Sequence, residues 1–241
     1  MGRTIGKTGC LFASCTAPWK ITHFIFGNVY STLTINFLYN IWIFLIWGFL
    51  LFQIYGLFGK HHRSHYILSF SLCWIVIGSF FALILSSAGP VYYGHITGLE
   101  DVYAPLMERL QAMDAQIRTD GGFWEIWALD VQDRLWLNYQ NAATTVGSGI
   151  SAMPSMHVSI ATLMALSARR IGLWFGRLMT GYAFLIMIGS VHLGWHYALD
   201  GYLALFLTIF LWKLADRIIH WAETARLPSP RRTAPPDQAR G

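Results

Sequence analysis

Residues 35–58 read INFLYNIWIFLIWGFLLFQIYGLF, a run without an acidic or basic side chain. A helix needs about 20 mostly apolar residues to cross the hydrocarbon core of a bilayer. We therefore expect a transmembrane helix from about Thr34 to Phe58. The composition agrees, because 55% of the 241 residues are hydrophobic and only 12% are charged, against roughly 25% charged in a soluble domain. The sequence predicts an all-α integral membrane protein.

Four more segments are expected to be helices of this kind, and the second of these four is short. They run approximately from Tyr66 to Ala88, from Pro154 to Arg169, from Leu178 to Leu193 and from Tyr197 to Ala215. The expected architecture is five transmembrane helices, with a sixth left open at the N-terminus. The short helix rises about 22 Å at 1.5 Å per residue, less than the roughly 30 Å of the hydrocarbon core. Its outer end is therefore expected below the membrane surface.

The chain divides into three predicted parts. Residues 1–33 form an N-terminal segment that is interfacial or incomplete, and residues 34–219 form the transmembrane domain. Residues 220–241 form a cytoplasmic tail, which is rich in Pro, Arg and polar residues and is expected to be disordered.

A long polar loop, residues 91–153, lies inside the transmembrane domain. Its apolar side chains recur at helical spacing and predict one or two amphipathic helices on the outer membrane surface; examples are Val102, Leu106, Leu110 and Met113. The loop also contains most of the chain's 12 acidic residues: Glu100, Asp101, Glu108, Asp114, Asp120, Glu125, Asp130 and Asp133. Because basic residues favour the cytoplasmic side, we expect this loop outside and the net basic loops near Lys60 and Arg169 inside.

This orientation predicts an integral protein of a bacterial inner membrane whose acidic loop faces the periplasm. Five helices then place the N-terminus outside as well, which conflicts with Arg3, Lys7 and Lys20. Three explanations are open. The segment Ile21–Ser31 is an interfacial helix, the chain lacks an upstream span, or the charge rule fails here.

The net charge of +5 does not indicate a nucleic-acid partner. The positive residues lie beside apolar segments, and no DNA- or RNA-binding motif is present. The three cysteines, Cys10, Cys15 and Cys73, show no metal-ligand spacing.

Two short stretches carry the polar residues best suited to chemistry. GISAMPSMH, residues 149–157, lies at the outer start of the third predicted helix. GSVHLGWHYALD, residues 189–200, spans the outer end of the fourth helix and the start of the fifth. Both are predicted on the side of the acidic loop. Ionisable residues at the ends of membrane helices indicate a functional site.

Each stretch suits the chemistry of a phosphate ester. Pro154 fits the first turn of a helix, where free backbone N–H groups and the Ser155 hydroxyl would offer donors to a phosphate beside His157. His196 and Asp200 share a helical face if the helix has begun by His196. Asp200 would then accept a hydrogen bond from one ring nitrogen and leave the other free as a nucleophile.

Two other functions remain open. His192, His196 and Asp200 are spaced four and four, and with His157 they could form the metal site of a membrane hydrolase. An anion is favoured, because the helix start in the Pro-Ser-x-His stretch attracts negative charge. The second alternative is a non-catalytic membrane protein, and the presence of His157, His196 and Asp200 together argues against it.

These residues resemble a known family. Pro154–His157 resembles the P-S-x-H motif of the type 2 phosphatidic acid phosphatase superfamily, and His196–Asp200 resembles its H-x-x-x-D motif, over a region from about Ser86 to Ala215. The resemblance implies that His196 attacks phosphorus, that Asp200 orients it and that His157 protonates the leaving alkoxide. It also implies that Ser155 binds the phosphate and that no metal or other cofactor takes part.

The departures from the family pattern indicate one branch. The larger branch has an S-R motif before its nucleophile, and this chain has Gly189-Ser190 at the corresponding positions, so the arginine is absent. In addition, no K-x-x-x-x-x-x-R-P motif precedes the long loop. Both departures, and the phrase AMPSMHVS, resemble the inositol phosphorylceramide synthase-like branch, which includes sphingomyelin synthases. That branch transfers a phospho-headgroup between lipids.

The expected activity is therefore that of a lipid-phosphate phosphohydrolase or phospho-headgroup transferase that acts through a phosphohistidine without a metal. Its partners would be a membrane lipid and a lipid or alcohol acceptor, with the oligomeric state left open. The basic residues that are absent from the two family motifs would neutralise the charge of the phosphate, so other residues must replace them. Arg134 is the first candidate because it precedes the aromatic segment Leu135–Tyr139. Other candidates from the loop and its flanks are Arg109, Arg118, Tyr92, Tyr93, His95 and His192.

Overall fold

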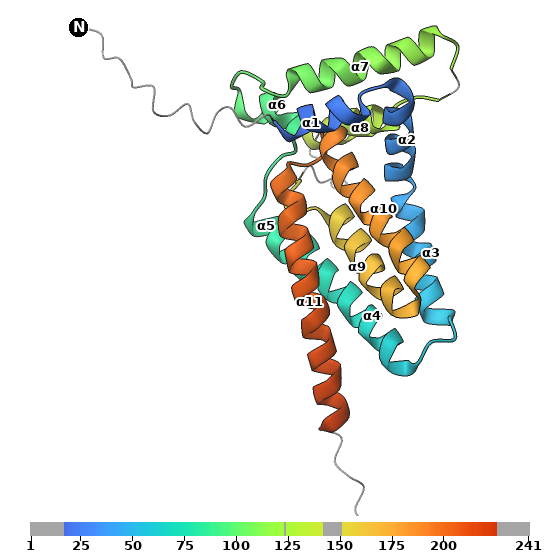
Figure 1. Ribbon diagram of the computed structural model, residues 1–241. Coiled ribbons are helices and arrows are strands. Elements are labelled where there is room, and N and C mark those ends of the chain that lie inside the picture. Colours follow the sequence, from blue (N-terminus) through green and yellow to red (C-terminus); the bar gives the residue numbers. More distant parts are fainter. Residues whose placement is uncertain (1–16, 123, 142–150, 226–241) are drawn as a thin grey trace, which may run out of the picture.

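The computed structural model describes residues 17–122, 124–141 and 151–225. Every regular element in these residues is a helix, which confirms the expected all-α class. In Figure 1 long helices pack side by side as a bundle, and shorter helices lie across one end of it. The bundle helices are α2 (Val29–Asn40), α3 (Trp42–Tyr55), α4 (Lys60–Leu72), η2 (Cys73–Phe81), α5 (Ala82–Ile84), α9 (Met156–Ile171), α10 (Leu173–His192) and α11 (Ala198–Thr224).

Helix α9 lies inside the bundle and packs against α3, α4, α10 and α11 (Figure 1). Its side chains are buried continuously from Val158 to Ala165, on all faces of the helix. Small side chains let neighbouring membrane helices approach closely, and α9 is rich in them: Ser159, Ala161, Thr162, Ala165, Ser167 and Ala168. A helix that is buried all round belongs to a core, so α9 is the centre of the packing.

Within the described residues, three helices are long and apolar enough to cross a membrane, which is compatible with an integral membrane protein. They are Lys60–Ile84, Leu173–His192 and Ala198–Thr224. The pair α2 and α3 adds a fourth if it is counted as one bent span. The count therefore differs from the expected five or six. The main reason is α9, whose 16 residues rise only about 24 Å and are enclosed by protein.

The first predicted transmembrane helix is broken at Ile41, where α2 and α3 meet at an angle of 42°. Just before the break, Asn40 Nδ2 donates a hydrogen bond to the carbonyl oxygen of Asn36 over 2.7 Å. A side chain that enters the i→i−4 ladder is a known cause of helix bending. The polar Asn40 thus gives the apolar run a corner that hydrophobicity alone did not predict.

The N-terminal helix α1 (Pro18–Phe26) lies across the same end of the bundle as α7 (Figure 1). Trp19 and His23 are buried under it, whereas Phe24 on its outer side is 91% exposed. Part of the segment Ile21–Ser31 is therefore helical, and its interfacial position stays a prediction.

Parts of both predicted terminal segments lie outside the described residues. These are residues 1–16, which include Arg3, Lys7, Cys10 and Cys15, and residues 226–241. Helix α11 continues through the predicted tail boundary at residue 220 and ends at Thr224.

Four helical elements form most of the predicted loop. They are η3 (Pro90–Tyr92), α6 (Tyr93–Thr97), α7 (Ala104–Thr119) and α8 (Trp127–Gln140). Figure 1 shows α7 and α8 crossing the end of the bundle. Leu106, Leu110 and Met113 of α7 are buried, on the face that their spacing predicted. We call α1 and these four elements the cap.

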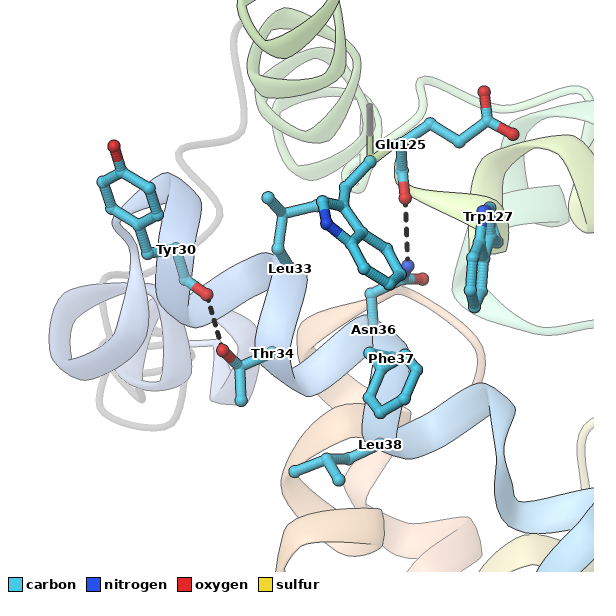
Figure 2. Close-up of a pocket in the computed structure, with 9 residues that line it drawn as sticks. Tyr30, Leu33, Thr34, Asn36, Phe37, Leu38, Glu125 and Trp127 are labelled. Atoms are coloured by element: carbon cyan, nitrogen blue, oxygen red, sulfur yellow. Dashed lines mark hydrogen bonds between the residues drawn. The ribbon is translucent and has the colours of Figure 1, made fainter. Parts of the chain in front are cut away.

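A buried asparagine holds the cap to the bundle. Figure 2 shows Asn36 of α2 donating from Nδ2 to the carbonyl oxygen of Glu125, over 3.3 Å. Its Oδ1 accepts from the N–H of Ala128, in the first turn of α8, over 3.1 Å. The N–H of Ala128, in the first turn of α8, has no acceptor inside that helix, and Asn36 supplies one. They therefore position α8 over the end of α2.

Asp114 provides a test of how the cap is held together. One of its carboxylate oxygens accepts from the buried N–H of Ile126 over 2.8 Å, and the other accepts from Arg118 Nε over 2.7 Å. Asp114→Ala leaves the Ile126 N–H without its partner, which costs about 1–3 kcal/mol. We expect a lower midpoint of thermal unfolding in detergent and faster amide exchange over α8.

The matched control is Arg118→Ala, which breaks the same ion pair from its exposed side. An ion pair on the surface contributes little to stability. An equal loss of stability in both variants would show that the backbone bond to Asp114 is not what holds α8.

Candidate active site

The two motifs meet at the start of α9 and are joined by two hydrogen bonds. The backbone N–H of Ser155 donates to the carbonyl oxygen of Asp200 over 3.3 Å. The ring nitrogen Nδ1 of His196 donates to the carbonyl oxygen of Ala152 over 2.7 Å. The structure thus brings His157, His196 and Asp200 together. Residues 149 and 150 of the first motif lie outside the described residues.

Gly89, directly before η3, permits this close packing of the two motifs. A Cβ atom at Gly89 would lie 2.4 Å from the carbonyl oxygen of Trp195, so a larger residue would push the second motif away. Two residues earlier, the carbonyl oxygen of Ser87 accepts from the N–H of Ala152 over 2.7 Å. The segment from Ser87 to Gly89 therefore contacts both motifs and fixes their spacing.

The hydrogen bond of His196 determines which of its nitrogens is free. A carbonyl oxygen can only accept, so Nδ1 of His196 must carry the proton that it donates to Ala152. In the neutral ring Nε2 then has the unshared electron pair. His196 is 8% exposed, and its ring is held in one orientation with a potential nucleophile at Nε2.

Asp200 does not make the hydrogen bond to His196 that its spacing suggested. The distance from Asp200 Oδ2 to His196 Nδ1 is 3.8 Å, and Oδ2 instead accepts from the backbone N–H of Tyr197 over 2.9 Å. The reason is that α11 begins only at Ala198, so His196 precedes the helix. The buried carboxylate of Asp200 therefore lies near the His196 ring without a hydrogen bond to it.

His157 is held between two aromatic rings. Its imidazole stacks on Tyr39 with a ring-centroid distance of 4.6 Å and on Trp42 with a distance of 4.1 Å. Trp42 Nε1 also donates to the backbone carbonyl oxygen of His157 over 3.1 Å. The centroids of the His157 and His196 rings lie 5.9 Å apart. Helices α2 and α3 thus orient a side chain of α9 toward the second motif.

Both imidazoles line one cavity of about 630 Å³, here called the catalytic cavity. Its walls come from α2, α3, η2, α5, α8, α9 and the segments before α6, α9 and α11. The described lining residues are Tyr39, Asn40, Trp42, Ile43, Gly78, Ala82, Tyr92, Val131, Leu135, Ser151, Ala152, Pro154, Met156, His157, Trp195 and His196. This cavity is large enough for a phosphate ester and part of its alcohol. The cavity drawn in Figure 2, between α2 and the start of α8, is lined by neither imidazole.

Ser155 lies at the helix start, as expected, and acts there as the N-cap of α9. Its Oγ accepts from the backbone N–H of Val158 over 3.4 Å, and the residue is fully buried. A serine at this position satisfies one of the free donors of the first turn. Its predicted contact with phosphate remains a prediction.

His192 is directed away from the catalytic cavity. Its ring stacks on His23 of α1 with a centroid distance of 3.9 Å, and its Nε2 lies 3.0 Å from Thr32 Oγ1. Burial, together with the nearby Arg109, lowers the pKa of His23. Two neutral rings can stack at this distance, so His192 connects α10 to α1.

The cluster needed for the metal-dependent alternative is not assembled. His192 is separated from His157 and His196 by its contacts with α1 and α2. Among residues 17–122, 124–141 and 151–225, no three His, Cys, Asp or Glu side chains lie close enough to share a metal ion.

The three arginines of the cap differ in their surroundings. Arg109 donates to the carbonyl oxygen of Gly27 over 3.0 Å, and Arg118 pairs with Asp114 and Glu125. Arg134 of α8 is exposed and has neither a hydrogen bond nor an ion pair with any described residue. It lies on α8 between the cavity-lining positions 131 and 135. Arg134 itself is not among the described lining residues of that cavity.

Tyr93 lies outside the described lining of the catalytic cavity, in α6, where its ring packs edge-on against Tyr103 at 5.7 Å. Sequence reasoning missed Tyr39, Trp42 and Trp195, which surround the imidazoles. Trp195 also has a buried Nε1 without a hydrogen-bond partner in the described residues. The signal that could have found Tyr39 and Trp42 is the pair of polar residues, Asn36 and Asn40, inside an otherwise apolar run.

Comparison with known proteins agrees with this geometry. The family model described as the PAP2 superfamily matches residues 15–214, a range that includes the cap, both motifs and the whole catalytic cavity. Neither the curated proteins nor the solved structures provide a match. Because the family model covers far more than half of the sequence, the chain belongs to the PAP2 superfamily.

Proposed function

We propose that this protein is a lipid-phosphate phosphohydrolase or phospho-headgroup transferase in which His196 carries the phosphoryl group. Members of the superfamily are phosphoesterases, which supports an enzyme of the phosphatase kind. The single observation that carries the proposal is the pairing of two imidazoles across one cavity, with ring centroids 5.9 Å apart. One of them, His196, has its Nδ1 proton committed to Ala152.

In the first step, Nε2 of His196 attacks phosphorus while the bond from phosphorus to the lipid oxygen breaks. His157 gives its proton to the departing alkoxide, so the mechanism requires this histidine to be protonated when the phosphate is bound. The His196 ring becomes positively charged as the bond forms. The Ala152 carbonyl and the Asp200 carboxylate, 3.8 Å from Nδ1, stabilise that charge.

In the second step, a water molecule or an alcohol takes the position that the first alkoxide left. Its oxygen bonds to phosphorus, its proton passes to His157, and the bond from phosphorus to His196 breaks. The protein returns to its starting state, and no cofactor or metal enters the balance. Water gives a phosphatase, and a lipid alcohol gives a transferase of the synthase-like branch.

The depth of the cavity supports a lipid substrate. Ile43, Gly78 and Ala82 line it, and they belong to helices of the apolar bundle. The site also lies at the end opposite the basic turn around Lys60 and Arg170 (Figure 1). Basic residues favour the cytoplasmic side, so we place the reaction at the periplasmic side of a bacterial inner membrane.

The central test measures the products from a panel of lipid phosphates, monoesters and diesters, with the wild type and His196→Ala. The wild type is expected to release phosphate or to transfer the phospho-headgroup to an added lipid alcohol, and activity is expected to survive EDTA. His196→Ala should be inactive, and rapid quenching followed by mass spectrometry should find a phosphoryl group on His196 in the wild type only.

Each other outcome is decisive. Activity that EDTA abolishes would support a metal-dependent hydrolase, and activity retained in His196→Ala would exclude the phosphohistidine. The ratio of free phosphate to new lipid separates a phosphatase from a transferase.

Arg134 is proposed to neutralise the phosphoryl group in place of the missing family arginines. It is exposed, has no described partner, and lies beside the cavity wall formed by Val131 and Leu135. Removing a charge-stabilising donor lowers kcat about 10²–10³-fold, so we expect Arg134→Ala to lose about two orders of magnitude in turnover. Arg118→Ala is the matched control, because Arg118 is occupied by Asp114 and Glu125. Near-normal turnover of Arg134→Ala would remove this residue from the mechanism.

A further inference from the structure

A groove of about 300 Å³ lies between α10 and α11, with α9 as its floor. We call it the α10–α11 groove. Its floor is buried, whereas Phe184 and Tyr202 on its two rims are 67% and 61% exposed. Among the described lining residues, Arg169 is the one charged side chain, and most of the others are apolar. The groove is therefore open on the outside of the bundle and suits an apolar ligand with a negative charge at one end.

The length of the groove matches one leaflet of a bilayer. Both rim helices are long and apolar enough to cross a membrane, so the groove faces hydrocarbon. Along its floor, the 11 residue steps from Val158 to Arg169 rise about 16 Å. The hydrocarbon core of a bilayer is about 30 Å thick, so half of it spans nearly the same distance. One acyl chain of a single leaflet fits this groove.

Arg169 is held against the wall of the groove. Its Nε donates to Thr180 Oγ1 over 3.1 Å. A Cβ atom at Gly176 would lie 2.7 Å from the Cα of Arg169, so this glycine lets the start of α10 pack against the end of α9. The two terminal nitrogens of the Arg169 guanidinium have no hydrogen bond to a described residue. Their planar arrangement suits a phosphate group.

Two more basic side chains extend the rims of the groove toward the same end. Arg177 precedes the lining residue Thr180 by three positions, and Lys213 follows the lining residue Ile209 by four, so each continues a rim of the groove. Both are exposed. Neither they nor Arg169 form an ion pair with an acidic residue in the described part of the chain. The groove thus ends at three positive charges without a described counter-ion.

An exposed tryptophan marks the level of these charges in the membrane. Trp174, in the first turn of α10, is 78% exposed, and the Arg177 guanidinium lies 5.0 Å from the centroid of its ring. Tryptophan side chains gather at the headgroup level of a bilayer. In the orientation proposed above, this level belongs to the cytoplasmic leaflet, which carries the anionic lipids that attract basic residues.

We propose that the α10–α11 groove binds an anionic phospholipid of the cytoplasmic leaflet. One acyl chain lies between the two helices, and the phosphate lies at Arg169, Arg177 and Lys213. Neither His157 nor His196 is among the described lining residues of this groove. The bound lipid is therefore a resident ligand that joins α10 to α11, and its site is distinct from the catalytic cavity.

The first test compares phosphatidylglycerol with phosphatidylcholine that has the same acyl chains. Each lipid is titrated into the full chain in detergent, and native mass spectrometry counts the bound molecules. The wild type is expected to bind phosphatidylglycerol more tightly and to unfold at a higher temperature when this lipid is present, because a ligand of the folded state stabilises it.

Charge variants assign this preference to the end of the groove. The double variant Arg169→Gln/Lys213→Gln should bind phosphatidylglycerol about fivefold more weakly for each charge removed, while Arg169→Lys keeps the charge and should keep most of the affinity. Lys60→Gln is the matched control, because Lys60 is exposed at the same basic end but belongs to α4, which does not line the groove. Equal affinity of the wild type for both lipids, or an unchanged affinity in the double variant, would overturn the proposal.

A filled groove tests the place of the acyl chain. Ala183 lines the groove, so Ala183→Phe should displace the lipid. Gly181→Phe is the matched control, because a Cβ atom at Gly181 meets nothing within 4 Å and this position does not line the groove. Lipid retained by Ala183→Phe would reject the groove as the site. A dimer that Ala183→Phe dissociates without loss of lipid would identify a second copy of the chain as the occupant and would also overturn the proposal. These measurements need no substrate, so their outcome is independent of the proposed reaction.

Discussion

The hydrogen bond from His196 Nδ1 to the carbonyl oxygen of Ala152 is the contact on which the rest of the site depends. It joins the segment before α9 to the segment before α11, and at 2.7 Å it sets the orientation of the ring and puts a proton on Nδ1. A backbone carbonyl cannot rotate away or change its charge, so it holds the ring more firmly than a mobile carboxylate would. The Asp200 carboxylate instead accepts from the N–H of Tyr197 and caps α11.

The second constraint is the burial of α9. Its small side chains let α3, α4, α10 and α11 approach closely, and the helix is too short to reach across a bilayer. Its N-terminal end consequently lies inside the protein, where Tyr39 and Trp42 enclose His157. A phosphate held at this depth is shielded from bulk water, and electrostatic interactions are stronger in such surroundings. The bend at Ile41 contributes to this enclosure, because it places one aromatic residue on each side of the corner.

The cap converts an open helix end into two cavities, the catalytic cavity and a second one between α1, α7, α10 and α11. Helix α8 covers the side of His157, and α1 and α7 cover the side of Tyr103. Asn36 and Asp114 hold these elements through backbone groups that would otherwise lack partners. His196 is the residue that both cavities share, so the geometry of the cap determines what reaches the proposed nucleophile from each direction.

The sequence by itself determined the helical class, most of the apolar segments and the two motifs, because hydrophobic length and the spacing of Pro154, His157, His196 and Asp200 are local properties. The resemblance to the superfamily drawn from these residues was confirmed, whereas the synthase-like branch and the roles of these residues stay predictions. Only the tertiary structure decided which contacts these side chains make. Spacing suggested a bond between His196 and Asp200, but α11 starts too late for it, and the backbone of Ala152 makes the bond instead. His192 has the same local signal as His196 and yet points toward His23, because the neighbour that a ring meets is set by packing between segments far apart in the chain.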